Sequence, residues 1–122
     1  MFVSGTWRGF WEQEGYGRQP MEAFELHFRV GDVTGHGRDV VGRFTCAGEY
    51  DETTGRVRMV KQYLGRHMVL YEGGPDGEGC IHGTWTIVNN VLGTKWLTTG
   101  PFVLYPDVPR PTGDEPIYEI KK

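Results

Sequence analysis

The 122-residue sequence is short of serine and of long apolar runs, and each shortage removes a class of protein. Its single serine, Ser4, lies outside any Gly-x-Ser-x-Gly motif, which argues against a serine hydrolase. No run approaches the ~20 apolar residues of a membrane-spanning helix. The first residues have neither the basic nor the apolar region of a signal peptide, so we expect a cytoplasmic protein.

Charge of one sign and cysteine are also scarce. The 13 basic and 16 acidic residues leave a net charge of −3, without a basic run, which disfavours nucleic acid and membranes as partners. Cys46 and Cys80 are too few for a disulfide framework and lack metal-ligand spacing, so we expect two free thiols. The four histidines do not converge on one predicted face. We therefore expect neither a metal nor another cofactor.

The sequence lacks helical periodicity, whereas signs of strands and turns are frequent. No window of helical length keeps an apolar stripe, and apolar and polar residues alternate almost from end to end. Glycine accounts for 19 residues and divides the chain into short segments. The strands that this pattern predicts cover residues 5–14, 24–30, 33–34, 40–50, 57–63, 67–71 and 81–87, with a last pair or one bent strand over 95–99 and 102–105.

The order of these segments favours one architecture. Sequential strands joined by short loops form an antiparallel meander, which removes its sheet edges by closing on itself. We therefore predict an all-β, single-domain, up-and-down β-barrel of about eight strands over residues 1–105. A β-sandwich is the alternative, although it usually needs a long Greek-key connection. Residues 106–122 are rich in proline and are predicted to be an extension that packs on the barrel or trails from it.

A Gly-Thr-Trp tripeptide occurs twice, at residues 5–7 and 83–85. A glycine two residues before a tryptophan on the first strand resembles the calycin superfamily, which contains the lipocalins and avidins. That resemblance implies an up-and-down barrel whose closed end is crossed by the Trp7 indole. The polar residues with which avidins hold biotin are not recognisable, so biotin binding is not implied. By itself the tripeptide indicates a structural role, because glycine lets a strand coil sharply and a ring lie over it.

The candidate site lies on the predicted hairpin of residues 56–73. If its apolar residues face the barrel interior, strict alternation turns a polar set inward with them. A buried ammonium group would then need a carboxylate, a phenol or an anionic ligand. In the alternative, Tyr63 and His67 lie at the rim and Lys61 extends into solvent. The candidate ligand-binding residues are Lys61, Tyr63, His67, Tyr71 and, from the preceding strand, Tyr50.

Polar groups inside an aromatic cavity favour recognition of one small molecule. We expect reversible binding of a partly apolar ligand that carries a carboxylate or carbonyl oxygen, without turnover and without an assigned catalytic residue. One alternative is a small barrel enzyme, an isomerase or hydrolase, that uses His67, Tyr63 or Lys61 as acid or base. Another is a protein-interaction or oligomerisation module, such as a homodimer, whose barrel is filled by its own rings.

Overall fold

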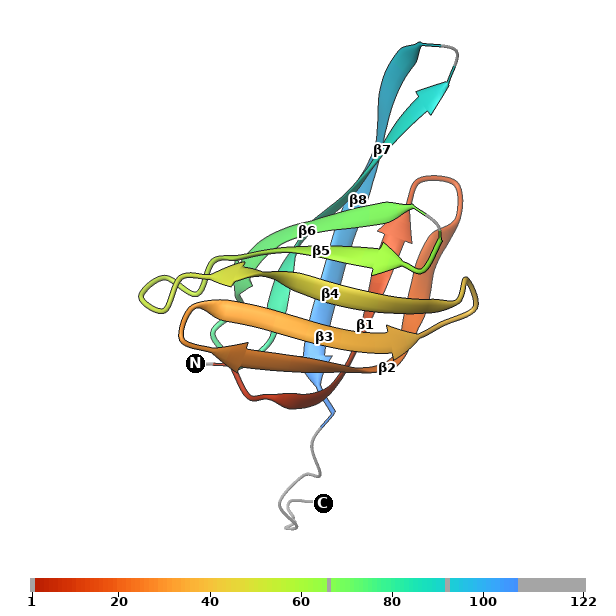
Figure 1. Cartoon of the computed structure of the whole chain (residues 1–122). Helices are drawn as coiled ribbons and strands as arrows, with labels where there is room; N and C mark the ends of the chain where they lie inside the picture. Colours follow the sequence, from red (N-terminus) through yellow and green to blue (C-terminus); the bar gives the residue numbers. More distant parts are fainter. Residues whose placement is uncertain (1, 66, 92, 108–122) are drawn as a thin grey trace.

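A computed structural model describes residues 2–65, 67–91 and 93–107 (Figure 1). Nothing in these ranges forms a helix long and apolar enough to cross a membrane. The described residues form eight antiparallel strands: β1 (Gly5–Gln13), β2 (Gly17–Arg29), β3 (Asp32–Arg38), β4 (Arg43–Tyr50), β5 (Val57–Tyr63), β6 (Met68–Pro75), β7 (Ile81–Val91) and β8 (Thr94–Pro106).

The strands follow one another around a closed barrel in sequence order, and β1 completes the circle by pairing with β8 (Figure 1). The predicted up-and-down barrel is thus confirmed, and the β-sandwich alternative is wrong. In such a meander the connections alternate between the two ends of the barrel. The β1–β2, β3–β4, β5–β6 and β7–β8 turns therefore share one end, and the N-terminal segment lies at the other.

Aromatic rings close the end that holds the N-terminal segment. Trp7 is fully buried there, and its indole Nε1 donates a hydrogen bond of 2.9 Å to the Val3 carbonyl oxygen. The Phe2 and Phe28 rings lie 6.3 and 5.6 Å from the Trp7 ring, and both also contact the Tyr50 ring. Trp7 is therefore buried among rings at this end of the barrel.

The two Gly-Thr-Trp copies need glycine for different reasons. Gly5 has a φ of 138°, a backbone conformation that residues with a Cβ atom rarely adopt. Gly83 needs no unusual φ, but a Cβ there would lie 2.1 Å from the Glu72 carbonyl oxygen and 2.5 Å from the Gly73 Cα. Gly83 and Gly73 are paired residues of β7 and β6, so these strands approach each other closely at this point.

Two strands extend through prolines that the sequence analysis treated as breaks. Pro20 lies within β2 and pairs only with Phe10 of β1, because β3 begins to pair with β2 at Phe24. Pro101 lies within β8 opposite Thr84 of β7, beyond the β1–β8 ladder. Proline is accepted where one side of a strand has no partner. β2 therefore begins at Gly17, well before the predicted start at residue 24, and the turn that precedes it covers residues 14–16.

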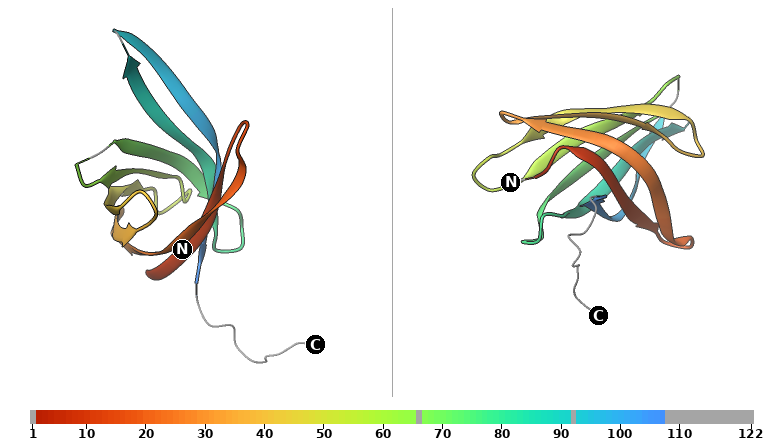
Figure 2. Two further views of the ribbon diagram at one scale, coloured as in Figure 1. Left: turned by 90° about the vertical axis from the view of Figure 1, so that its right-hand side faces the viewer. Right: turned by 90° about the horizontal axis from the view of Figure 1, so that it is seen from below.

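β7 and β8 continue to pair with each other beyond the β1–β8 ladder, and their hairpin therefore projects past the rest of the barrel (Figure 2). At the other end of β8, the backbone N–H of Asp107 donates to the Thr6 carbonyl oxygen, and its carboxylate lies 2.9 Å from the Arg8 Nε. The chain thus stays on the barrel through residue 107. The rest of the predicted C-terminal extension, residues 108–122, lies outside the described residues.

Candidate functional site

The end of the barrel opposite the aromatic rings opens into a cavity of about 410 Å³. The β1–β2 and β7–β8 hairpins form one wall of this open cavity, and the β5–β6 hairpin with the β3–β4 turn forms the other. Its volume is within the range of about 300–1,000 Å³ that is usual for small-molecule sites. The apolar and aromatic residues that line it are Trp11, Pro20, Met21, Val40, Val41, Tyr63, Val69, Tyr71, Trp85 and Ile87.

Four of the five candidate residues line the open cavity. They are Lys61, Tyr63, His67 and Tyr71. Lys61 pairs with Val69 across the β5–β6 hairpin, and the Tyr63 ring lies 5.2 Å from the His67 ring. His67 is exposed at the rim, as the alternative interpretation expects, whereas Tyr63 is 5% exposed.

The structure places Tyr50 away from this wall, at the closed end of the barrel. The inward residues of β4 run from Phe44 near the open cavity to Tyr50 at the far end of the strand. Tyr50 therefore shares their face but not their height along the barrel axis. Its ring packs 5.4 Å from that of Phe28.

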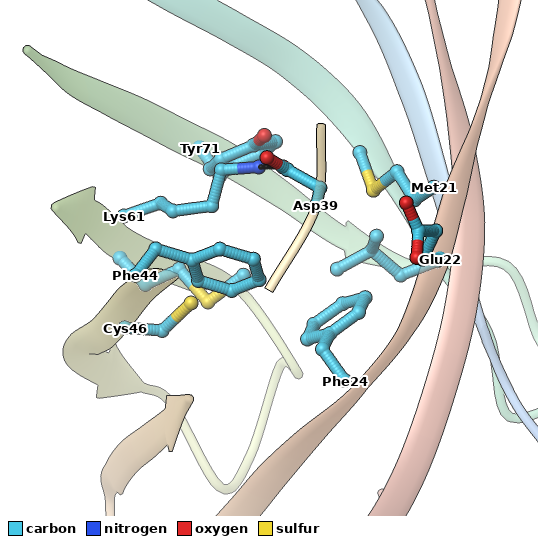
Figure 3. Close-up of a pocket in the computed structure, with 10 residues that line it drawn as sticks. Met21, Glu22, Phe24, Asp39, Phe44, Cys46, Lys61 and Tyr71 are labelled. Atoms are coloured by element: carbon cyan, nitrogen blue, oxygen red, sulfur yellow. Dashed lines mark ion pairs between the residues drawn. The ribbon is translucent and has the colours of Figure 1, made fainter. Parts of the chain in front are cut away.

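Lys61 is buried, with 9% of its side chain exposed, and its ammonium group faces one carboxylate and three rings. The Nζ atom lies 3.5 Å from Asp39 Oδ2. It also lies 4.7, 5.0 and 5.6 Å from the ring centroids of Phe44, Tyr63 and Tyr71. Figure 3 shows Lys61 and Asp39 meeting beside Tyr71. The alternative in which Lys61 extends into solvent is wrong.

Burial controls the protonation of this lysine. It lowers the pKa of Lys61 below the ordinary lysine value, because removal from water destabilises the charged form more than the neutral form. The Asp39 carboxylate opposes this shift by favouring the ammonium form. Burial and the Asp39 carboxylate therefore shift the pKa of Lys61 in opposite directions. Because the net shift is downward, a neutral amine forms more easily here than on an exposed lysine.

Asp39 is the site residue that the sequence analysis missed. It begins the β3–β4 turn, where its Oδ1 atom accepts the backbone N–H of Val41 at 2.9 Å. Its Oδ2 atom accepts the Tyr63 hydroxyl at 2.5 Å and faces Lys61. The predicted strand over residues 40–50 begins too early. The strand begins at Arg43, because the turn held by Asp39 occupies residues 39–42.

The phenol and thiol groups near Lys61 are held in their protonated forms. Burial raises the pKa of Tyr63 and Tyr71 above the ordinary tyrosine value, and the hydrogen bond to Asp39 adds to the shift at Tyr63. Burial also raises the pKa of the Cys46 thiol to about 12. Cys46 is consequently no nucleophile near neutral pH. Both cysteines are free, as expected.

A second, much smaller cavity of about 20 Å³ lies beside Lys61 and is lined by Phe24, Phe44 and Cys46 (Figure 3). It is too small for an organic ligand and is close in scale to a single water molecule. Lys61, Asp39 and Tyr71 border both cavities. The ion pair therefore stands between the open cavity and the packed interior.

Two tryptophans form the wall that faces the ion pair. The Trp11 and Trp85 rings meet edge to face, with centroids 5.7 Å apart. The Trp85 Nε1 atom donates to the Glu12 carbonyl oxygen at 2.9 Å, so the polar atom of this buried indole is satisfied within the protein. The indole surfaces remain apolar contacts for whatever enters the cavity.

Among the described residues, no group of three or more His, Cys, Asp or Glu side chains is placed to hold a metal ion. Comparisons with protein-family models, curated proteins and solved structures give no match. The fold, an antiparallel eight-stranded barrel with Trp7 at its closed end, is consistent with the calycin-like architecture.

Proposed function

We propose that the protein reversibly binds one small molecule in the open cavity without converting it. The ligand has an apolar body, which contacts Trp11, Trp85 and Ile87, and one oxygen that accepts a hydrogen bond from Lys61. The observation that supports this proposal is a buried ammonium group on the wall of an otherwise mostly apolar cavity of about 410 Å³. A cavity of this composition orients a ligand by its few polar groups and binds it by its apolar surface.

The charges around the cavity restrict the chemistry of that oxygen. Asp39 already pairs with Lys61, and Glu22 is a second carboxylate among the lining residues. A carboxylate ligand would meet both of these negative charges. A carbonyl oxygen needs a donor but no positive charge in excess, so it fits the site better than a carboxylate does.

A thermal-shift screen tests the proposal with ligand pairs of matched shape, octanoic acid with octanal and cinnamic acid with cinnamaldehyde. A ligand at 100 times its dissociation constant adds about 2.7 kcal/mol to the free energy of unfolding. We expect the Lys61→Met variant to bind about tenfold more weakly or worse, since a hydrogen bond from a charged donor is lost. The matched control is Tyr105→Phe, because Tyr105 is exposed on β8 and does not line the cavity.

If no compound raises the unfolding midpoint of the wild-type protein, the binding proposal is abandoned in favour of the interaction module. An isomerase or hydrolase remains the alternative class, because Lys61, Asp39 and Tyr63 place an amine, a carboxylate and a phenol within contact of one another. Recovery of an altered compound after incubation with the protein would establish turnover and exclude simple binding.

A further inference from the structure

We propose that Lys61 binds aldehydes covalently, as a reversible imine whose positive charge is balanced by Asp39. This inference rests on the proposed function, since the open cavity must admit a small molecule. It goes further in naming the ligand class and the bond that holds it. The geometry that supports it is a buried amine bordering a ligand-sized cavity, with a carboxylate beside its nitrogen atom.

Lys61 is well placed to meet a ligand. Among the described residues that line the open cavity, it is the one lysine or arginine. Its Nζ atom is surrounded by the Phe44, Tyr63 and Tyr71 rings, which limit the water around it. Lysines in such apolar surroundings lose their proton more readily, and the neutral amine is the nucleophile in imine formation. The lowered pKa of Lys61 agrees with this geometry.

The reaction balances with the groups at hand. The neutral amine of Lys61 attacks the carbonyl carbon, a C–N bond forms, and the carbonyl electron pair moves to oxygen. Proton transfer from nitrogen to that oxygen gives a carbinolamine. Protonation of its hydroxyl group and loss of water then leave a protonated C=N bond. Overall, a lysine ammonium and an aldehyde give a protonated imine and one water, so no oxidant or reductant is needed.

The Asp39 carboxylate can pair with the Lys61 ammonium group before the reaction and with the protonated imine after it. Its Oδ2 atom lies 3.5 Å from Nζ, close enough to accept the proton that the ammonium loses and to return it in the dehydration step. The charge at nitrogen is +1 before and after the reaction, so the ion pair is kept. A carboxylate ligand would instead compete with Asp39 for Lys61. Tyr63 acts as a positioning residue, because its hydroxyl donates to the same Oδ2 atom at 2.5 Å.

The test is reductive trapping of the full chain at pH 7.5 with cinnamaldehyde or octanal and sodium cyanoborohydride. Intact-mass measurement followed by peptide mapping reports which amine is modified. The chain has four lysines, of which Lys95, Lys121 and Lys122 serve as internal references. We expect Lys61 to be trapped at least tenfold faster than any of these three. Cinnamyl alcohol or octanol, which cannot form an imine, should slow trapping at Lys61 by occupying the cavity.

Variants at Lys61 and Asp39 test the imine directly. Lys61→Arg keeps a cation beside Asp39 but cannot form an imine, so it should lose the fast adduct while cinnamyl alcohol still raises its unfolding midpoint. Lys61→Met serves the same purpose if the larger arginine prevents folding. Asp39→Asn removes the counter-ion and should lower the pH at which the cinnamaldehyde imine loses its red-shifted, protonated absorption band.

The outcomes separate the two proposals. If cinnamyl alcohol stabilises the protein but cinnamaldehyde labels Lys61 no faster than the reference lysines, the imine proposal is wrong and reversible binding stands. If neither compound stabilises the protein and Lys61 shows no preference, both proposals fail. An unchanged absorption band in Asp39→Asn would remove the role of Asp39 as counter-ion.

Discussion

Lys61 and Asp39 form a pair whose presence is not explained by stability. Taking both charges out of water costs free energy that their attraction only partly offsets, and replacing both members of such a pair by apolar residues is often neutral, whereas removing one member leaves the other charge without that partner. Asp39 keeps other partners without the lysine, because it also binds Val41 and Tyr63. Lys61→Met should therefore fold, which makes it a usable variant for the binding experiments.

Cys46 gives the molecule a defined sensitivity to alkaline pH. Burial raises the pKa of this thiol from its ordinary value of 9.0 to about 12, so above pH 9 the folded state binds more protons than the unfolded state. Stability is therefore complete below pH 9 and is lost as the pH rises. Between pH 8 and 10.5 this one group should reduce the free energy of unfolding by about 2 kcal/mol.

Urea unfolding of wild type and Cys46→Ala at several pH values between 8 and 10.5 measures this contribution. The variant should lose stability less steeply with pH than wild type, even though its smaller side chain lowers the free energy of unfolding at every pH. Tyr63, Tyr71 and Lys61 titrate in both proteins and largely cancel in the comparison. Parallel curves for the two proteins would contradict the assignment.

The sequence predicts on which face of a strand a site residue lies, but it predicts less well where along the barrel axis that residue lies. Alternation along β5 and β6 was enough to find Lys61, Tyr63 and Tyr71, because the period of a strand is fixed. It did not separate them from Tyr50, since residues on one face of β4 range from one end of the barrel to the other. Asp39 was missed because a turn residue has no alternation. An inward lysine in need of a carboxylate was the indication that pointed toward it.

At the scale of the strands, the sequence analysis was least accurate where a strand has one neighbour. Proline lacks the N–H group that a strand paired on both sides needs, and the predicted strands leave out Pro20 and Pro101. Both lie on projecting parts of hairpins, where the ladder on one side has already stopped. Which segments of a meander project depends on the stagger between distant strands. That stagger is not visible in the local sequence.

The close approach of β6 and β7 gives a matched pair of glycine substitutions. A Cβ on Gly73 would lie 2.2 Å from the His82 carbonyl oxygen, whereas a Cβ on the adjacent Gly74 would meet only the flexible Arg56 side chain, at 3.4 Å. Gly73→Ala should lower the free energy of unfolding by about 1–3 kcal/mol through forced backbone movement. Gly74→Ala should change it by less than about 0.5 kcal/mol.

Chemical denaturation of both variants, with circular dichroism to confirm the strand content, provides the measurement. Neither glycine has a positive φ, so backbone strain affects both substitutions equally little and the difference reports crowding alone. Equal losses at the two positions would mean that the strands can separate at Gly73 without cost.

The two ends of the barrel differ, although the two tryptophans in them belong to copies of the same Gly-Thr-Trp tripeptide. Trp7 packs with Phe2 and Phe28 and closes one end, whereas Trp85 stands with Trp11 on the wall of the open cavity. The strand order and barrel closure could be predicted because they follow from local patterns and loop lengths. The open cavity could not, because composition gives the number of rings but not their distribution between the two ends.

The pairing of β1 with β8 means that barrel closure depends on strands from opposite ends of the barrel sequence. Until residues 102–106 are available, β1 lacks its partner along one edge, and residues 81–83 of β7 lack theirs. Without these residues the barrel cannot close, and closure joins the most distant contacts of the described strands. A chain ending at residue 100 should aggregate on expression, whereas one ending at 107 should refold as a monodisperse species by size-exclusion chromatography. Soluble, folded protein from the shorter chain would show that the barrel does not need the β1–β8 pairing.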